Sequence, residues 1–206
     1  MRGGILLTGF DAFEGVAVNP SRHVVEALAG QVVSGVPVHG LVLPTVFDES
    51  RRQLEAALAT LRPRLALALG AAASRSAISV ERVAINVDDA RIADNAGRQP
   101  IDRAVVPGAP AAYFARLPIK AVVAGLRDAG FDAEVSQTAG TFVCNHVFYA
   151  LMHALRRRRR VRAGFVHLPL PADAQSAARQ VGAVRVVLEV ALGNDVDLRA
   201  AGGAVD

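Results

Sequence analysis

The residue best suited to chemistry in this chain is Cys144, its only cysteine. It follows a strand-like stretch that begins at Ala133 and a turn at Gly140, and it opens a segment whose apolar residues recur at helical spacing. The unpaired N–H groups and positive dipole end of a first helical turn favour a thiolate, the attacking form of cysteine, and could bind an oxyanion. The alternative is that Cys144 is a small hydrophobic side chain of the core.

A cysteine nucleophile needs a base within hydrogen-bond reach, and this base is usually a histidine. His146 and His153 follow Cys144 by two and nine residues, which places them about 200° and about 180° around the predicted helix. Neither histidine shares the face of the thiol, so both are poor partners for it.

The other histidines belong to other predicted elements. His39 is in the middle of a strand, and His23 is in the first turn of a helix, where the dipole disfavours an imidazolium. His167 stands at the end of the predicted strand Ala163–Leu168 and is the best placed base. The alternative for His167 is a structural histidine that bonds a backbone carbonyl at the strand end.

A third residue must orient the imidazole, and Glu81 is the candidate. In a strand over Ile78–Val87, Glu81 shares its face with the alternate apolar residues up to Val87. A carboxylate on an apolar face needs a partner, because burying it alone costs several kcal/mol. An imidazolium would serve, but Arg75 or Arg82 would serve equally well.

Asp88 and Asp89 are the competing acids. Together with Asp94 or histidines they suggest a metal-assisted hydrolase, but their spacing matches no known ligand pattern. We therefore expect them to cap turns in a loop, and we expect no metal and no cofactor.

Strand and helix patterns alternate along the chain, which predicts an α/β fold with a mostly parallel, twisted sheet and helices on both faces. Residues 88–118 interrupt the pattern as a long excursion over a site. Ligands of such sheets bind beyond the carboxyl ends of the strands. The predicted strands are Gly4–Thr8, Val36–Leu43, Arg64–Leu69, Ile78–Val87, Ala133–Gln137 and Ala163–Leu168, and the predicted helices are Pro20–Ala29, Asp48–Leu61, Ile119–Gly130, Cys144–Arg158 and Ala174–Leu192.

Composition limits the class of protein. The chain has 206 residues, of which 52% are hydrophobic, so we expect a single domain over residues 1–206. A domain of this size buries a core that needs no disulfide or metal ion to stabilise it. A lone cysteine forms no internal disulfide and no signal peptide is visible, which predicts a cytoplasmic protein. No apolar run reaches the roughly 18 to 20 residues of a membrane span, so we expect no membrane partner.

The net charge of +4 is concentrated in one run, Arg156–Arg160, at the end of the helix that Cys144 opens. Cations there offset the negative end of the helix dipole and solvate a surface turn. The alternative is a nucleic-acid-binding protein without catalysis, but such a patch would want stacking aromatics, and tryptophan is absent. We therefore expect no nucleic-acid partner.

Four long motifs in this chain resemble, in order, those of the pyroglutamyl peptidase type I family of cysteine peptidases. The resemblance covers nearly the whole chain. The motifs are Leu7–Phe13 with Asn19–Ser21 behind it, Val80–Ile92, Ser136–Asn145 and Gly164–Pro169.

This resemblance implies an α/β/α sandwich, a triad of Cys144, His167 and Glu81, and peptides with an N-terminal pyroglutamate as substrates. It also implies a homotetramer. Arg91 resembles an aid to substrate or oxyanion binding, with a surface salt bridge as its alternative. The apolar pocket for the pyroglutamyl ring would be formed by Phe10, Phe13, Thr45, Ile92, Phe142 and Val143.

The chain departs from the family pattern at two positions. Ala71 stands where many relatives have glutamine, so it cannot donate a side-chain hydrogen bond to the ring, and we expect a higher KM with the triad intact. Ala93 stands where proline is frequent, which predicts a looser loop at Ile92.

Overall fold

The computed structural model describes residues 3–13 and 19–203. Their elements follow the predicted alternation of strands and helices. In chain order they are β1 (Ile5–Phe10), α1 (Pro20–Leu28), β2 (Val32–Val33), β3 (Val36–Leu43), α2 (Phe47–Leu61), β4 (Leu65–Ala71), β5 (Ile78–Glu81), β6 (Val83–Ile85), β7 (Ala112–Phe114), α3 (Ile119–Asp128), β8 (Ala133–Ser136), α4 (Val143–Ala154), β9 (Arg162–Leu168) and α5 (Ala174–Gly193).

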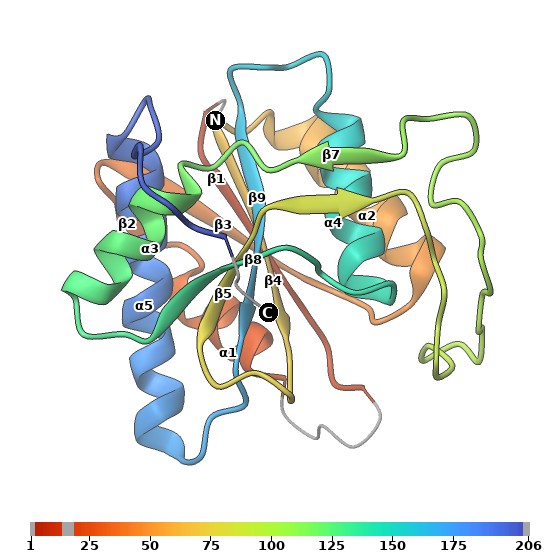
Figure 1. The fold of residues 1–206 in the computed structure, drawn as a ribbon, viewed down its shortest axis with the longest axis horizontal. Helices are drawn as coiled ribbons and strands as arrows, with labels where there is room; N and C mark the ends of the chain where they lie inside the picture. Colours follow the sequence, from red (N-terminus) through yellow and green to blue (C-terminus); the bar gives the residue numbers. More distant parts are fainter. Residues whose placement is uncertain (1–2, 14–18, 204–206) are drawn as a thin grey trace.

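A seven-stranded sheet in the order β2-β3-β1-β4-β9-β5-β8 forms the centre of the molecule (Figure 1). The pairs β1 with β3, β1 with β4, β4 with β9, and β5 with β8 are parallel. Short β2 pairs antiparallel with β3, and β5 pairs antiparallel with β9. The prediction of a mostly parallel sheet is confirmed.

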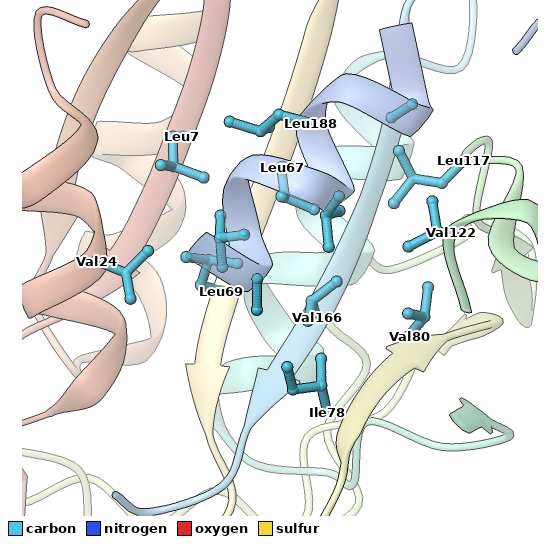
Figure 2. Close-up of a cluster of buried hydrophobic side chains, with 14 of the residues drawn as sticks. Leu7, Val24, Leu67, Leu69, Ile78, Val80, Leu117, Val122, Val166 and Leu188 are labelled. Carbon is cyan, nitrogen blue, oxygen red and sulfur yellow. The ribbon is translucent and has the colours of Figure 1, made fainter. Parts of the chain in front are cut away.

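Helices cover both faces of this sheet, because alternate strand residues point to opposite sides. Leu65, Leu67 and Leu69 of β4 join the cluster that contains α1, α3 and α5, shown in Figure 2. Ala66 and Ala68 join the second cluster, under α2 and α4. In Figure 1, α3 and α5 lie left of the sheet, and α2 and α4 lie right of it. The expected three layers are confirmed.

The prediction of one continuous strand over Ile78–Val87 is wrong. β5 ends at Glu81, and Val83–Ile85 forms β6, which pairs with β7 in a separate two-stranded sheet. The N–H of Arg82 donates to the carbonyl of Ser136, where β8 ends, so the central sheet offers no further partner beyond this point. Glu81 therefore does not share a strand face with Val87.

The excursion between β6 and β7 forms the right-hand edge of Figure 1. The buried Asn145 side chain of α4 joins it to the fold. Its carbonyl oxygen accepts from the Ile85 N–H, and its amide donates to the carbonyls of Ile85 and Val87. The strand β7, which the sequence pattern did not reveal, returns the chain to β6. The excursion is therefore tied directly to the helix that carries Cys144.

Helix α4 ends at Ala154, four residues before the predicted end at Arg158. The run Arg156–Arg160 follows the helix and is exposed to solvent. Arg156 donates to the carbonyl of His153, and Arg158 donates to the carbonyl of Leu58 near the end of α2. Arg156 and Arg158 thus bind carbonyl groups near helix ends, where a positive charge offsets the negative end of the helix dipole.

Candidate active site

Strand parity brings three polar or small residues to the α4 side of the sheet. Gly70 of β4 and His167 of β9 are paired in register, and they lie on the α4 face because they stand two residues beyond Ala68 and Phe165 of that cluster. Ser79 of β5 pairs with His167, so Glu81, two residues further, lies diagonally across from it on the same face. Ile78 and Val80 point to the opposite cluster. The short β5 strand alone therefore aims Glu81 at His167.

Glu81 and His167 form a buried hydrogen bond. The distance between His167 Nδ1 and Glu81 Oε1 is 2.7 Å, and the two side chains are 5% and 0% exposed. The same oxygen accepts from Arg75 Nη1 at 2.6 Å, so the buried carboxylate has a cationic partner. A carboxylate only accepts, so Nδ1 carries the proton and Nε2 is left as an acceptor. The sequence left His167 and Arg75 as alternative partners of Glu81, and the structure places both there.

Cys144 is in the first turn of α4, directly above Gly70. A Cβ atom on Gly70 would lie 2.8 Å from Cys144 Sγ and 2.8 Å from Phe165 Cζ, so only glycine leaves room for the thiol. Because Gly70 is the register partner of His167, this contact places the sulfur beside the imidazole strand. No side chain caps the start of α4 at Phe142, so its first N–H groups are free to face a ligand.

Burial sets the charge of both groups in the free protein. It raises the pKa of the Cys144 thiol to about 12; the negative charge of Glu81 adds to the rise, and Arg75 opposes it. Burial also lowers the pKa of His167, although its hydrogen bond to Glu81 acts in the opposite direction. The first helical turn was expected to favour a thiolate, but burial is the larger effect. At neutral pH the pair is therefore a thiol beside a neutral imidazole.

A cavity of about 340 Å³ opens over these residues. Cys144 and His167 line it, and Glu81 lies behind His167. All seven residues predicted from the family motifs to bind substrate line this cavity, among them Arg91, whose side chain is exposed. The lining comprises Phe10, Phe13, Asn19, Thr45, Ala71, Asp89, Arg91, Ile92, Ala139, Gly140, Thr141, Phe142, Val143, Cys144 and His167.

Residues that sequence reasoning missed hold the cavity walls. The carboxylate of Asp11 accepts from both the hydroxyl and the N–H of Thr45, at 2.7 Å each. The Thr141 hydroxyl donates to the carbonyl of Asp89, which fixes the excursion against the segment before α4. Asp11 stands inside the first family motif, but only the fold shows that it reaches Thr45. Ala71, at the end of β4, adds no polar side-chain group to the wall.

Asp88 and Asp89 differ in their surroundings, because Asp88 is buried whereas Asp89 is exposed and lines the cavity. Asp88 is fully buried, and its two carboxylate oxygens each lie 3.0 Å from His146 Nδ1. The expectation that Asp88 caps a turn is therefore wrong. Asp94 does act as a cap and accepts from the N–H groups of Ala96 and Arg98. Within the described residues, no three potential ligands gather as a metal site would require.

Comparison with known proteins agrees with this arrangement. The family model described as pyroglutamyl peptidase matches residues 3–196. A pyrrolidone-carboxylate peptidase of Ralstonia nicotianae is 54% identical, with 97% of each chain covered. One from Klebsiella pneumoniae is 53% identical, with 98% of each covered.

Solved structures of the same family superpose closely on this chain. Pyroglutamyl peptidase I from Bacillus amyloliquefaciens has a TM-score of 0.92 at 38% identity, and the match covers 98% of this chain and 100% of that one. Pyrrolidone carboxyl peptidase from Thermococcus litoralis has a TM-score of 0.93 at 31% identity, with 97% and 99% covered.

The two neighbouring aspartates provide a test of the buried pair. Replacing Asp88 with alanine leaves His146 buried without its acceptor, so we expect the free energy of unfolding to fall by about 1 to 3 kcal/mol. Asp89→Ala is the matched control at an exposed side chain, and we expect a change within about 0.5 kcal/mol. Urea unfolding measures both. Equal changes in the free energy of unfolding in the two variants would contradict the assignment of Asp88 and His146 as a buried pair.

Proposed function

This chain belongs to the pyroglutamyl peptidase family and removes N-terminal pyroglutamate from peptides, and we propose that Cys144, His167 and Glu81 carry out this reaction. As a cysteine-type omega peptidase, it needs a nucleophile, a base and an orienting group. The observation that carries the proposal is that Cys144 and His167 line one cavity while Glu81 hydrogen-bonds His167 from behind.

The pyroglutamyl ring occupies the cavity. It is a flat, uncharged lactam, which suits walls of aromatic and aliphatic side chains such as Phe10, Phe142 and Val143. Its ring amide finds partners among the backbone groups of the segment before α4. The wall at Ala71 contributes no hydrogen bond, which supports the expectation of a raised KM.

Attack begins from the neutral pair. The Cys144 sulfur bonds to the carbonyl carbon that joins pyroglutamate to the next residue, while its proton moves to His167 Nε2. The carbonyl oxygen becomes an oxyanion, which the first N–H groups of α4 and Arg91 stabilise. Glu81 stabilises the imidazolium that forms and holds its tautomer and orientation.

Collapse of the intermediate breaks the amide bond. His167 gives its proton to the leaving amine, and a pyroglutamyl thioester remains on Cys144. A water molecule then attacks this thioester and passes a proton to Nε2. The sulfur departs, takes the proton back, and free pyroglutamate is released.

Replacing Cys144 with serine tests this mechanism. We expect loss of nearly all hydrolysis of a pyroglutamyl reporter amide, because a serine hydroxyl is a much weaker nucleophile in a site built for sulfur. Iodoacetamide should inactivate the wild-type protein, and a chelator should leave it active.

Two outcomes would contradict the assignment. Full activity of Cys144→Ser would show that another group attacks the substrate. Loss of activity with chelator, together with indifference to iodoacetamide, would instead support a metal-assisted hydrolase at Asp88 and Asp89.

A homotetramer in the cytoplasm is the assembly that we propose. The family resemblance supports the tetramer, and so do the large apolar side chains Ile101 and Phe114, which are 74% and 70% exposed in the single chain. The lone cysteine supports a reducing compartment. No helix within the described residues is long and apolar enough to cross a membrane.

Fractionation of cells followed by gel filtration with light scattering tests the assembly. We expect the activity in the cytoplasmic fraction, at about four times the chain mass of 21.6 kDa. Activity at the mass of one chain, or in another fraction, would contradict it.

A further inference from the structure

Arg75 connects two parts of the site that are distant in the sequence. It lies in the loop after β4 and reaches Glu81 with Nη1 at 2.6 Å and the carbonyl of Thr138 with Nη2 at 2.7 Å. Its side chain is only 20% exposed, and that of Glu81 is fully buried. A planar guanidinium can bind both acceptors at once, whereas an ammonium cannot match this geometry.

Arg75 contacts the same carboxylate oxygen of Glu81 that accepts the hydrogen bond from His167. Glu81 Oε1 accepts from both Arg75 and His167, and Glu81 Oε2 has no partner within the described residues. Without Arg75, the buried carboxylate would face only a neutral imidazole. Such a carboxylate is stabilised by a positive charge, and its remaining partner, His167, supplies one by taking up a proton.

The contact with Thr138 fixes the segment that leads into the nucleophile. The carbonyl of Thr138 also accepts from the Ser136 hydroxyl, and the Thr138 hydroxyl accepts from the N–H of Gly140. Residues 139–143 of this segment line the cavity and lead directly to Cys144. Arg75 thus bonds both to Glu81, which is the hydrogen-bond partner of His167, and to the segment that leads to Cys144.

We propose that Arg75 is a positioning residue for the reaction, which holds the Glu81 carboxylate as the acceptor for His167 and fixes the Thr138 segment beside Cys144. This inference rests on the proposed function. Arg75 does not touch the reacting atoms and acts through Glu81 and the backbone.

The charges around His167 give the direction of the expected effect. The groups that face it are Glu81 from β5, Arg75 from the loop after β4, and Cys144 from α4. Arg75 lowers the pKa of both His167 and Cys144. Its removal therefore raises both pKa values, so more of His167 is protonated and idle at a given acidic pH.

The test compares Arg75→Met and Arg75→Lys with the control Arg127→Met, which removes an arginine bound to the carbonyl of Ala133 at the far end of β8. The ring of His167 is titrated by NMR, with a His167→Gln spectrum to assign its signal. The kcat/KM for a pyroglutamyl reporter amide is measured across pH, and thermal unfolding checks the fold.

We expect His167 to titrate at higher pH in Arg75→Met and at the wild-type pH in Arg127→Met. The loss of kcat/KM in Arg75→Met should grow as the pH falls, and if the pKa of His167 rises by about one unit, it approaches an extra factor of about ten at pH values well below the wild-type pKa. Arg75→Lys should recover part of the loss, because it restores the charge but not both hydrogen bonds.

An unchanged His167 titration in both Arg75 variants, or an activity loss that is uniform with pH, would overturn the inference and leave Arg75 a merely structural residue. Should Arg75→Met fail to fold, kcat/KM of Arg75→Lys decides: lysine keeps the charge but cannot make both hydrogen bonds, so a wild-type kcat/KM in this variant would overturn the inference. Should the wild-type protein not cleave the reporter, the proposed function fails, but the NMR titration still tests the effect of Arg75 on His167.

Discussion

The arrangement of the site depends on one buried carboxylate. Glu81 is fully enclosed, and a lone charge there would cost far more than the fold could tolerate. Hydrogen bonds from His167 and Arg75 to a single oxygen remove most of that cost. The same bonds fix the imidazole tautomer and leave Nε2 as an acceptor for the thiol. A requirement of folding and a requirement of the proposed reaction are thus met by the same contact.

The sheet makes this contact possible. Its antiparallel junction, between β9 and β5, brings His167 and Glu81 together from strands that run in opposite directions. The parallel neighbour β4 contributes Gly70, whose missing side chain admits the sulfur of Cys144 from above. The uncapped first turn of α4 then faces the cavity. The three groups of the proposed triad are therefore each carried by a regular element, and the long excursion supplies Arg91 and one wall of the cavity.

Much of this was predictable from the sequence, because periodicity is a local property. The alternation of strands and helices indicated the layers, and helix geometry excluded His146 and His153 as partners of Cys144. The motifs identified Glu81, His167 and the cavity residues. Local patterns did not reveal the end of β5, since Val83 and Ile85 suit a strand in either sheet, and the partner that decides lies about thirty residues away in β7.

Pairs between distant side chains were also outside the reach of sequence reasoning. The bond between Asp88 and His146, the bond between Asp11 and Thr45, and the simultaneous use of Arg75 and His167 by Glu81 depend on the fold. The burial of Cys144 was also not evident from the sequence. The helix terminus alone favours a thiolate at Cys144, whereas desolvation at this partly buried position raises the pKa of the thiol and favours its neutral form.

The role of the Glu81 carboxylate is tested most directly by the pH dependence of kcat/KM for a pyroglutamyl reporter amide, measured in the wild-type protein and in Glu81→Gln. The proposed mechanism requires a neutral His167, so activity should fall with decreasing pH through the His167 pKa, which burial holds below its usual value. Glu81 raises that pKa, so the acidic limb of Glu81→Gln should move to lower pH, and kcat should fall because the tautomer of His167 is no longer fixed. An unchanged limb with nearly full activity would contradict the central role of the Glu81 carboxylate.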